Sequence, residues 1–226
     1  MTTISRSLDQ PASVLSGQPD NARRTIAGVL LLLAGTTVLM GIITAEALYP
    51  ASYNTHTQSV SDLAAMRPDN IVRQPSATIF NLTMILAGLS IAVAAYFLHR
   101  AGNRRRMMLP VAVLGVGMVG VGFFPGNHLA PHTFFAMTAF TAGGVGAIAT
   151  AKLHTGALRW LHTSLGIIAL TSLVVGGVFL VDWAPVARLG EGGVERWVVY
   201  PVVLWVVTLG ASLASSRAPA DPTPDR

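Results

Sequence analysis

The chain has 226 residues, of which 11% are charged and 52% are hydrophobic. A soluble domain carries about 25% charged residues, so this chain has too little charge to cover the surface of a soluble fold. The composition argues against a compact cytosolic enzyme and indicates a polytopic membrane protein. Cysteine is absent, which excludes a disulfide framework, a thiolate zinc site and a cysteine nucleophile.

Six stretches of the chain are apolar and long enough to cross the hydrocarbon core of a bilayer, which takes about 20 helical residues. Five of them contain no Asp, Glu, Lys or Arg, and the other contains only Glu46, near its end. We therefore predict an all-α fold, a polytopic bundle of six transmembrane helices in one domain over residues 26–215. The polar residues 1–25 and 216–226 are predicted to be disordered cytoplasmic tails. The predicted spans cover residues 26–48, 76–98, 107–124, 133–151, 160–181 and 197–215.

The distribution of Lys and Arg predicts the orientation in the membrane, because cytoplasmic loops carry the excess of these residues. With the N-terminus inside, the inner segments hold 11 of them and the outer segments hold 4. We therefore predict that both termini are cytoplasmic and that the protein is a multi-pass component of a cell membrane, the inner membrane of a bacterium. The basic run 104–106 is interpreted as an anchor facing anionic lipid. Nucleic-acid binding is not predicted, because the run is short and lacks interleaved aromatic residues.

The end of the first span leaves an alternative open. The sequence Ala45-Glu46-Ala47 is similar to a signal-peptidase site. The apolar region before it, residues 26–44, has 19 residues, whereas the apolar part of a signal peptide has about 7–15. A retained first span is therefore favoured, and cleavage would leave five spans with an outside N-terminus.

Polar residues suited to a site gather in the loops predicted to lie outside, residues 49–75, 125–132 and 182–196. These loops contain His, Asp, Glu, Asn, Ser and Tyr, whereas the inner loops contain mostly Arg, Lys and Gly. Any binding or active site is therefore expected at the extracytoplasmic face.

His128 and His132 are the first candidates, because two imidazoles at positions i and i+4 of a helix face the same way and can share a metal. Asp62 or Glu195 is expected to supply a carboxylate ligand, and a bound water would then be activated for hydrolysis. Pro131 suits the first turn of a helix, which would place His128 before the helix and break the register. The favoured alternative is that each His binds a loop carbonyl or a tyrosine, so a divalent metal such as zinc is the less favoured interpretation.

Ser61 and Asp62 precede a short apolar run, and two interpretations are weighed. The favoured one is a helix N-cap through Ser61 or Asp62. The other is a catalytic carboxylate at Asp62, with a serine nucleophile that would need a base within hydrogen-bond reach.

Glu46 ends the first span and Asn81 lies early in the second, where polar groups are costly unless they are paired or face a cavity. With Tyr49 they are predicted to line an outward-facing pocket. The alternative for Glu46 is contact with interfacial water.

Glu195 and Arg196 precede the last span, and neighbours on a helix do not face each other. Their partners are therefore expected elsewhere, with Asp62, Arg67 and Arg73 as candidates. The favoured interpretation is an ion-pair network that locks the outer loops together.

Several short motifs follow one another in an order typical of a known family. They are Leu48-Tyr49-Pro50, Tyr53-Asn54, Val60-Ser61-Asp62-Leu63, Phe80-Asn81, Val121-Gly122-Phe123-Phe124-Pro125 with His128 and His132, and Gly192-Gly193-Val194-Glu195-Arg196. On these motifs residues 26–215 resemble a six-span bacterial and archaeal membrane family known as domain of unknown function 998, which implies a fold but no activity. More remotely, the chain is similar to DRAM, Frag and Sfk-type membrane proteins, a eukaryotic group associated with lipid handling. Arg67-Pro68-Asp69 stands where those proteins tend to carry a Pro-Glu pair.

Two functions from different classes are therefore predicted. In the first, the protein binds or modifies membrane lipids in a polar extracytoplasmic pocket, with Asp62, His128, His132 and Glu195 as catalytic candidates. In the second, it is a non-catalytic accessory or transport-related subunit whose outer polar residues form a structural network. The five charge-free spans argue against an ion pathway through the bilayer centre. The pocket-lining candidates are Glu46, Tyr49, Tyr53, Asn54, Ser61, Asn81 and Arg196.

Overall fold

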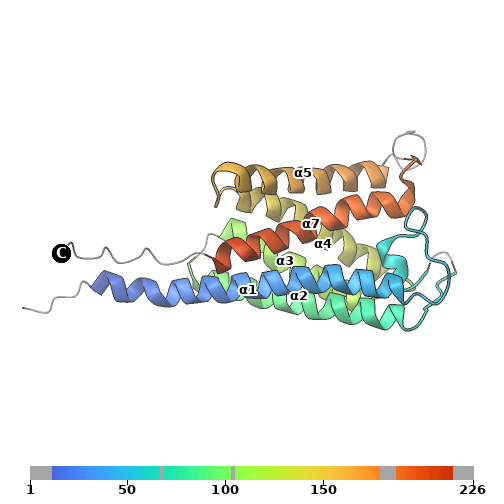
Figure 1. Ribbon diagram of the computed structural model, residues 1–226, viewed down its shortest axis with the longest axis horizontal. Coiled ribbons are helices and arrows are strands. Elements are labelled where there is room, and N and C mark those ends of the chain that lie inside the picture. The colour runs from blue at the N-terminus through green and yellow to red at the C-terminus, as the bar shows by residue number, and fades with distance from the viewer. Residues whose placement is uncertain (1–11, 67–68, 103–104, 179–186, 216–226) are drawn as a thin grey trace, which may run out of the picture.

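The computed structural model describes residues 12–66, 69–102, 105–178 and 187–215, and this part of the chain is helical with connecting loops. Its long helices lie along a common direction (Figure 1). One short 3-10 helix, η1, lies in the loop that follows α1. The helices are α1 (Ala12–Ala47), η1 (Val60–Leu63), α2 (Ser76–Arg100), α3 (Arg105–Phe123), α4 (Leu129–Ala151), α5 (Gly156–Val178) and α7 (Gly190–Ala214).

Five helices in the described residues are long and apolar enough to cross a membrane, and they belong to α1, α2, α4, α5 and α7. Helix α3 contributes a shorter apolar stretch, Met108–Phe123. A helix rises about 1.5 Å per residue, and the hydrocarbon core is about 30 Å thick. The prediction of an all-α, membrane-type protein is therefore confirmed, with five helices that satisfy the length criterion and a sixth that is shorter.

Helix α1 corrects one prediction, since it begins at Ala12 and residues 12–25 are helical rather than part of a disordered tail. Arg23 explains part of this extension: its guanidinium donates to the Asp20 carboxylate, one turn earlier, at 2.9 Å. The same group donates to the carbonyl of Arg100 at the end of α2, at 3.1 Å. Apolar sequence marks only the part of a helix that suits lipid, and these polar contacts extend α1 beyond it. Residues 1–11 and 216–226 lie outside the described part of the chain.

The long helices form a closed ring. Each of α1 to α5 packs against the next described helix in chain order, α7 packs against α5 and α1, and α4 also contacts α7 across the ring. Helix α1 begins, and α7 ends, at the end of the bundle opposite η1 (Figure 1). We call the end of the bundle at which η1 lies the η1 end.

Glycines bring the helices of the ring close together. Between α2 and α3, a Cβ added at Gly88 would lie 2.7 Å from the Gly115 carbonyl oxygen, and one added at Gly115 would lie 2.8 Å from that of Gly88. Reciprocal pairs of the same kind join α1 to α7 and α4 to α5. Small residues permit such backbone contact in membrane proteins, where lipid provides little hydrophobic drive for helices to associate.

Candidate functional site

The loop after α1 folds over the η1 end, and the short helix η1 is buried. Its N-cap is Ser59, whose backbone N–H donates to the Asp62 carboxylate at 2.8 Å. The Ser59 and Ser61 hydroxyls lie 2.9 Å apart. The N-cap is therefore Ser59 rather than the predicted Ser61 or Asp62, and Asp62 completes a capping box from the third position of η1. A carboxylate there also offsets the positive end of the helix.

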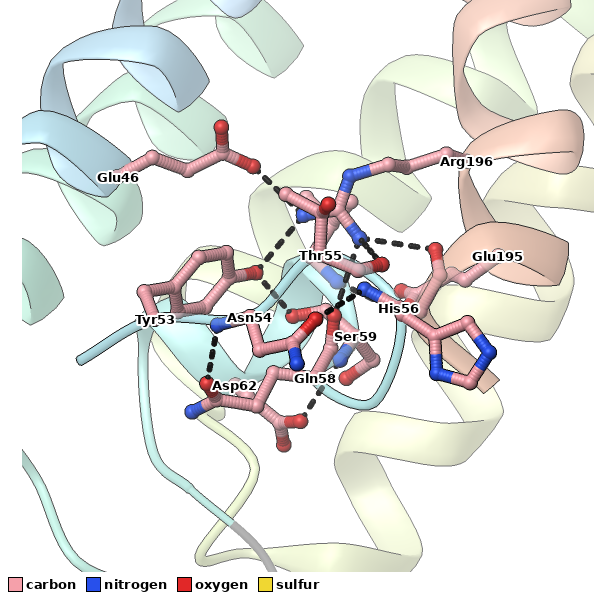
Figure 2. Close-up of polar contacts among 12 residues, drawn as sticks. Glu46, Tyr53, Asn54, Thr55, His56, Gln58, Ser59, Asp62, Glu195 and Arg196 are labelled. Carbon is pink, nitrogen blue, oxygen red and sulfur yellow. Dashed lines mark hydrogen bonds and ion pairs between the residues drawn. The ribbon is translucent and has the colours of Figure 1, made fainter. Parts of the chain in front are cut away.

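Arg196, in the second turn of α7, is the centre of the polar contacts at this end (Figure 2). One of its terminal nitrogens donates to the Glu46 carboxylate at 2.6 Å and to the Tyr53 hydroxyl at 3.0 Å. The other donates to the backbone carbonyls of Thr55, Gln58 and Gly192 at 3.1, 3.0 and 2.8 Å. Arg196 therefore ties the end of α1, the loop and the start of α7 together.

Arg196 interacts with Glu46 through an ion pair and with Tyr53 through a hydrogen bond. Burial raises the pKa of the Tyr53 hydroxyl well above its ordinary value. The positive charge of Arg196 and its hydrogen bond to Tyr53 oppose this rise, whereas the negative charges of Glu46 and Glu195 add to it. The neutral hydroxyl donates to the Ser59 carbonyl at 2.7 Å. The Arg196 and Glu46 side chains are 11% and 23% exposed, so their ion pair is largely shielded from water.

Glu195 contacts the same loop from the neighbouring position. Its carboxylate accepts a hydrogen bond from the backbone N–H of Val60, the first residue of η1, at 2.9 Å. The sequence predicted Asp62, Arg67 or Arg73 as partners for Glu195 and Arg196, but the described partner of Arg196 is Glu46, 150 positions away. Arg67 lies outside the described residues.

The two candidate histidines differ in burial. His128 is the N-cap of α4 and is exposed, with its ring against the edge of Phe124. His132 is 4% exposed, and its Nδ1 lies 2.8 Å from the Phe124 carbonyl oxygen. Within the described part of the chain, no group of three or more His, Asp or Glu side chains is arranged to hold a metal ion. The catalytic roles of Asp62, His128, His132 and Glu195 stay predictions.

A cavity of about 280 Å³ lies inside the ring, with lining residues from all six long helices and from η1. We call it the bundle cavity. Most of its lining is apolar, from residues such as Phe80, Met84, Leu114 and Val202. Its polar lining comes from Ser61, His132, Thr133, Ser172, Glu191 and Glu195. His132 and Thr133 lie in the first turns of α4, and Glu191 and Glu195 lie in the first turns of α7. These four residues therefore line the cavity at the η1 end.

The bundle cavity is open on one side. Thr133 and Met137 of α4 line it and are also exposed, Met137 by 45%. Leu173 and Gly176 of α5 line the cavity as well. Helix α5 is the least buried of the five long apolar helices. The exposed lining residues therefore place the mouth of the bundle cavity beside the first turns of α4.

A second cavity, of about 430 Å³, lies among residues of the loop between α1 and α2, and we call it the vestibule. Its lining includes Tyr49, Gln58, Asp62 and Arg73. Glu191 lines both cavities. η1 stands between them, because Ser61 lines the bundle cavity and Asp62 the vestibule.

Of the seven predicted pocket residues, Ser61 and Tyr49 line these two cavities, whereas Glu46, Tyr53, Asn54, Asn81 and Arg196 do not. The Asn54 side chain accepts a hydrogen bond from the His56 backbone N–H at 2.9 Å, which braces the loop. The side-chain oxygen of Asn81 is buried without a hydrogen-bond partner, and Asn81 lines neither cavity. The structure thus gathers Glu46, Tyr53, Ser61, Asp62, Glu195 and Arg196 around the loop.

Glu191 was missed by the sequence reasoning, although a signal for it exists. Residues four apart on a helix lie on one face. Helix α7 begins at Gly190, so Glu191 and Glu195 project to the same side. The sequence placed Glu191 in a glycine-rich loop, and this helical start was therefore not anticipated.

The fold and the apolar helices define a helical protein of the membrane type. A family model described as protein of unknown function DUF998 matches residues 32–212. The chain therefore belongs to that family, as its motifs predicted. No curated protein and no solved structure matches the chain.

Proposed function

We propose that the protein binds an amphiphile from the membrane, with an apolar chain in the bundle cavity and a polar head at the η1 end. The observation that carries this proposal is the polarity of one cavity: apolar side chains from every long helix along most of it, and His132, Glu191 and Glu195 at one end. Ligand pockets commonly enclose about 300–1,000 Å³. The bundle cavity, at about 280 Å³, is close to the lower end of this range, so it has room for part of one acyl chain.

Binding is a better fit to this geometry than hydrolysis. The Asp62 carboxylate closes the cap of η1, and the Ser59 and Ser61 hydroxyls are within hydrogen-bond distance of each other. These contacts give the carboxylate and the two hydroxyls a structural role in the cap of η1. The lipid is therefore proposed as a bound ligand.

A second candidate function rests on Arg196. Its hydrogen bonds join α1, the loop and α7, which is what an accessory subunit with a structural outer network would need. Filling the bundle cavity tests the two against each other, because only the first function depends on its empty volume.

The variant Ala136→Trp places an indole in the bundle cavity, which Ala136 lines. Val116→Trp is the matched control, since Val116 is 57% exposed and does not line the cavity. Purified in a mild detergent and analysed by native mass spectrometry, the wild type and Val116→Trp should retain one lipid per chain and Ala136→Trp none. Equal retention in all three, or none in the wild type, would refute amphiphile binding.

We also propose that all six long helices cross a bacterial inner membrane, with the η1 end outside. The support is the excess of Lys and Arg in the segments at the other end. The absence of cysteine makes single-cysteine labelling direct. Ser52→Cys, an exposed loop position, should react in intact cells with a reagent that cannot cross membranes, whereas Lys152→Cys should react only after permeabilisation. The reverse pattern would refute the orientation.

A further inference from the structure

Arg73 lies shortly before α2 and lines the vestibule. Its backbone carbonyl accepts a hydrogen bond from the Ala77 N–H at 2.9 Å, which ties this residue to the first turn of α2. The Nε of Arg73 is buried without a hydrogen-bond partner, and the contacts of the described residues include no ion pair of its guanidinium. Because a buried donor without an acceptor is costly, this guanidinium calls for an acceptor that the described residues do not supply.

Two further donors in the vestibule meet a weak acceptor. The Tyr49 hydroxyl and the side-chain nitrogen of Gln58 both donate to the Met66 sulfur, at 3.5 and 3.2 Å. The side-chain oxygen of Gln58 accepts from the Asn54 N–H at 2.7 Å, which fixes the amide with its nitrogen toward Met66. A thioether sulfur accepts hydrogen bonds only weakly. Both donors can therefore turn to a stronger acceptor and lose little.

The acidic residues of the vestibule have partners of their own. Asp62 and Glu191 line it, and both take part in interactions with other groups. The Asp62 carboxylate accepts from the Ser59 N–H at 2.8 Å, within the capping box of η1. Among the described lining residues, the charged side chain without a hydrogen bond or ion pair is therefore the cation Arg73.

We propose that the vestibule binds the phosphoryl group of an anionic ligand, with Arg73 as its charged partner and Tyr49 and Gln58 as further donors. A guanidinium pairs with phosphate through two parallel hydrogen bonds. A terminal phosphoryl group carries three acceptor oxygens, enough for all three side chains, whereas a carboxylate has two. The volume of about 430 Å³ leaves room for the rest of a small ligand. This inference does not rest on the proposed function, because η1 stands between the vestibule and the bundle cavity.

The phosphoryl group can belong to a free solute or to a lipid head, and two probes distinguish these sources. Equilibrium dialysis of the full-length protein in detergent measures the binding of radiolabelled inorganic phosphate at constant ionic strength. Native mass spectrometry measures the binding of phosphatidic acid against diacylglycerol, which has the same acyl chains and no phosphate. Saturable binding of inorganic phosphate supports a free solute, and a preference for phosphatidic acid without binding of inorganic phosphate supports a lipid head.

Three variants locate the site. Arg73→Gln should weaken the binding of the phosphoryl probe at least about tenfold, which corresponds to about 1.4 kcal/mol, because it removes the charged donor. Tyr49→Phe keeps the ring and removes the hydroxyl, so we expect binding to weaken about threefold. Arg188→Gln is the matched control, since Arg188 is exposed at the same end and does not line the vestibule. It should bind as the wild type does.

The wild-type measurements decide first, whatever the stability of the variants. If the wild type neither binds inorganic phosphate nor prefers phosphatidic acid to diacylglycerol, the phosphoryl site is overturned. It is also overturned if Arg73→Gln binds the probe as tightly as Arg188→Gln does. Neither result changes the test of the bundle cavity with Ala136→Trp, so failure of this site and failure of the proposed function are distinguishable.

Discussion

Replacing Arg196 by methionine tests whether this residue holds the η1 end together. Methionine preserves much of the length of the side chain and removes the guanidinium. The Glu46 carboxylate, the Tyr53 hydroxyl and three backbone carbonyls, which now accept hydrogen bonds of 2.6–3.1 Å, would lose their donor. We expect the folded state to be destabilised and the loop after α1 to become accessible to proteases.

The magnitude follows from burial. Removing one partner of a buried ion pair costs about 3–5 kcal/mol, and the Arg196 and Glu46 side chains are 11% and 23% exposed. Partial access of water to Glu46 favours the lower limit, about 3 kcal/mol. In a protein of this size each kcal/mol shifts the unfolding midpoint by about 2–4 °C, so we expect a decrease of about 6–12 °C.

The assay is thermal unfolding of the detergent-solubilised protein, followed by intrinsic fluorescence. Arg188→Met is the matched control, because Arg188 is exposed at the same end and, among the described residues, only its backbone carbonyl takes part in a hydrogen bond. The double variant Glu46→Gln with Arg196→Met should be more stable than Arg196→Met alone, since it leaves no unpaired carboxylate. If Arg196→Met shifts the midpoint no more than Arg188→Met does, Arg196 does not stabilise this end as argued.

Two further changes test the packing and the opposite end of the bundle. Gly88→Ala should destabilise the protein by about 1–3 kcal/mol, because the new Cβ would lie 2.7 Å from the Gly115 carbonyl oxygen; Leu89→Ala on the exposed face is the control, and equal unfolding midpoints would contradict the close contact. Burial lowers the pKa of His154 below its ordinary value, so the unfolded state takes up its proton first and stability should fall as the pH drops below about 6.5. Unfolding midpoints measured across this pH range should depend less on pH in His154→Asn than in the wild type, whereas the exposed control His128→Asn should behave like the wild type. An equal decline of stability in the wild type and His154→Asn would contradict the assignment of the pH dependence to His154.

The membrane helices could be predicted because their requirement is local. A segment in lipid must satisfy its own backbone hydrogen bonds and carry few charges, and both properties can be seen in a window of about 20 residues. The family could be identified from short motifs for the same reason, and the match over residues 32–212 confirms it. The capping function of Asp62 also depends only on Ser59, three residues earlier.

The polar ends of helices were harder to predict. Helix α1 extends back to Ala12 and α7 begins at Gly190, both in sequence that is not apolar. Arg23 extends α1 through a contact with Arg100, far away in the chain. Hydrophobicity alone therefore underestimated both helices, and with the start of α7 it missed Glu191.

By itself, the sequence determined the class of fold, the apolar helices and the family, because each depends on residues that are close in the chain. Only the tertiary structure decided that α7 closes the ring on α1, that Arg196 pairs with Glu46, and that His132 and Glu195 line the same cavity while His128 does not. The pair of Arg196 and Glu46 alone joins positions that are 150 residues apart. These relations depend on how whole helices pack, which no local pattern of residues specifies.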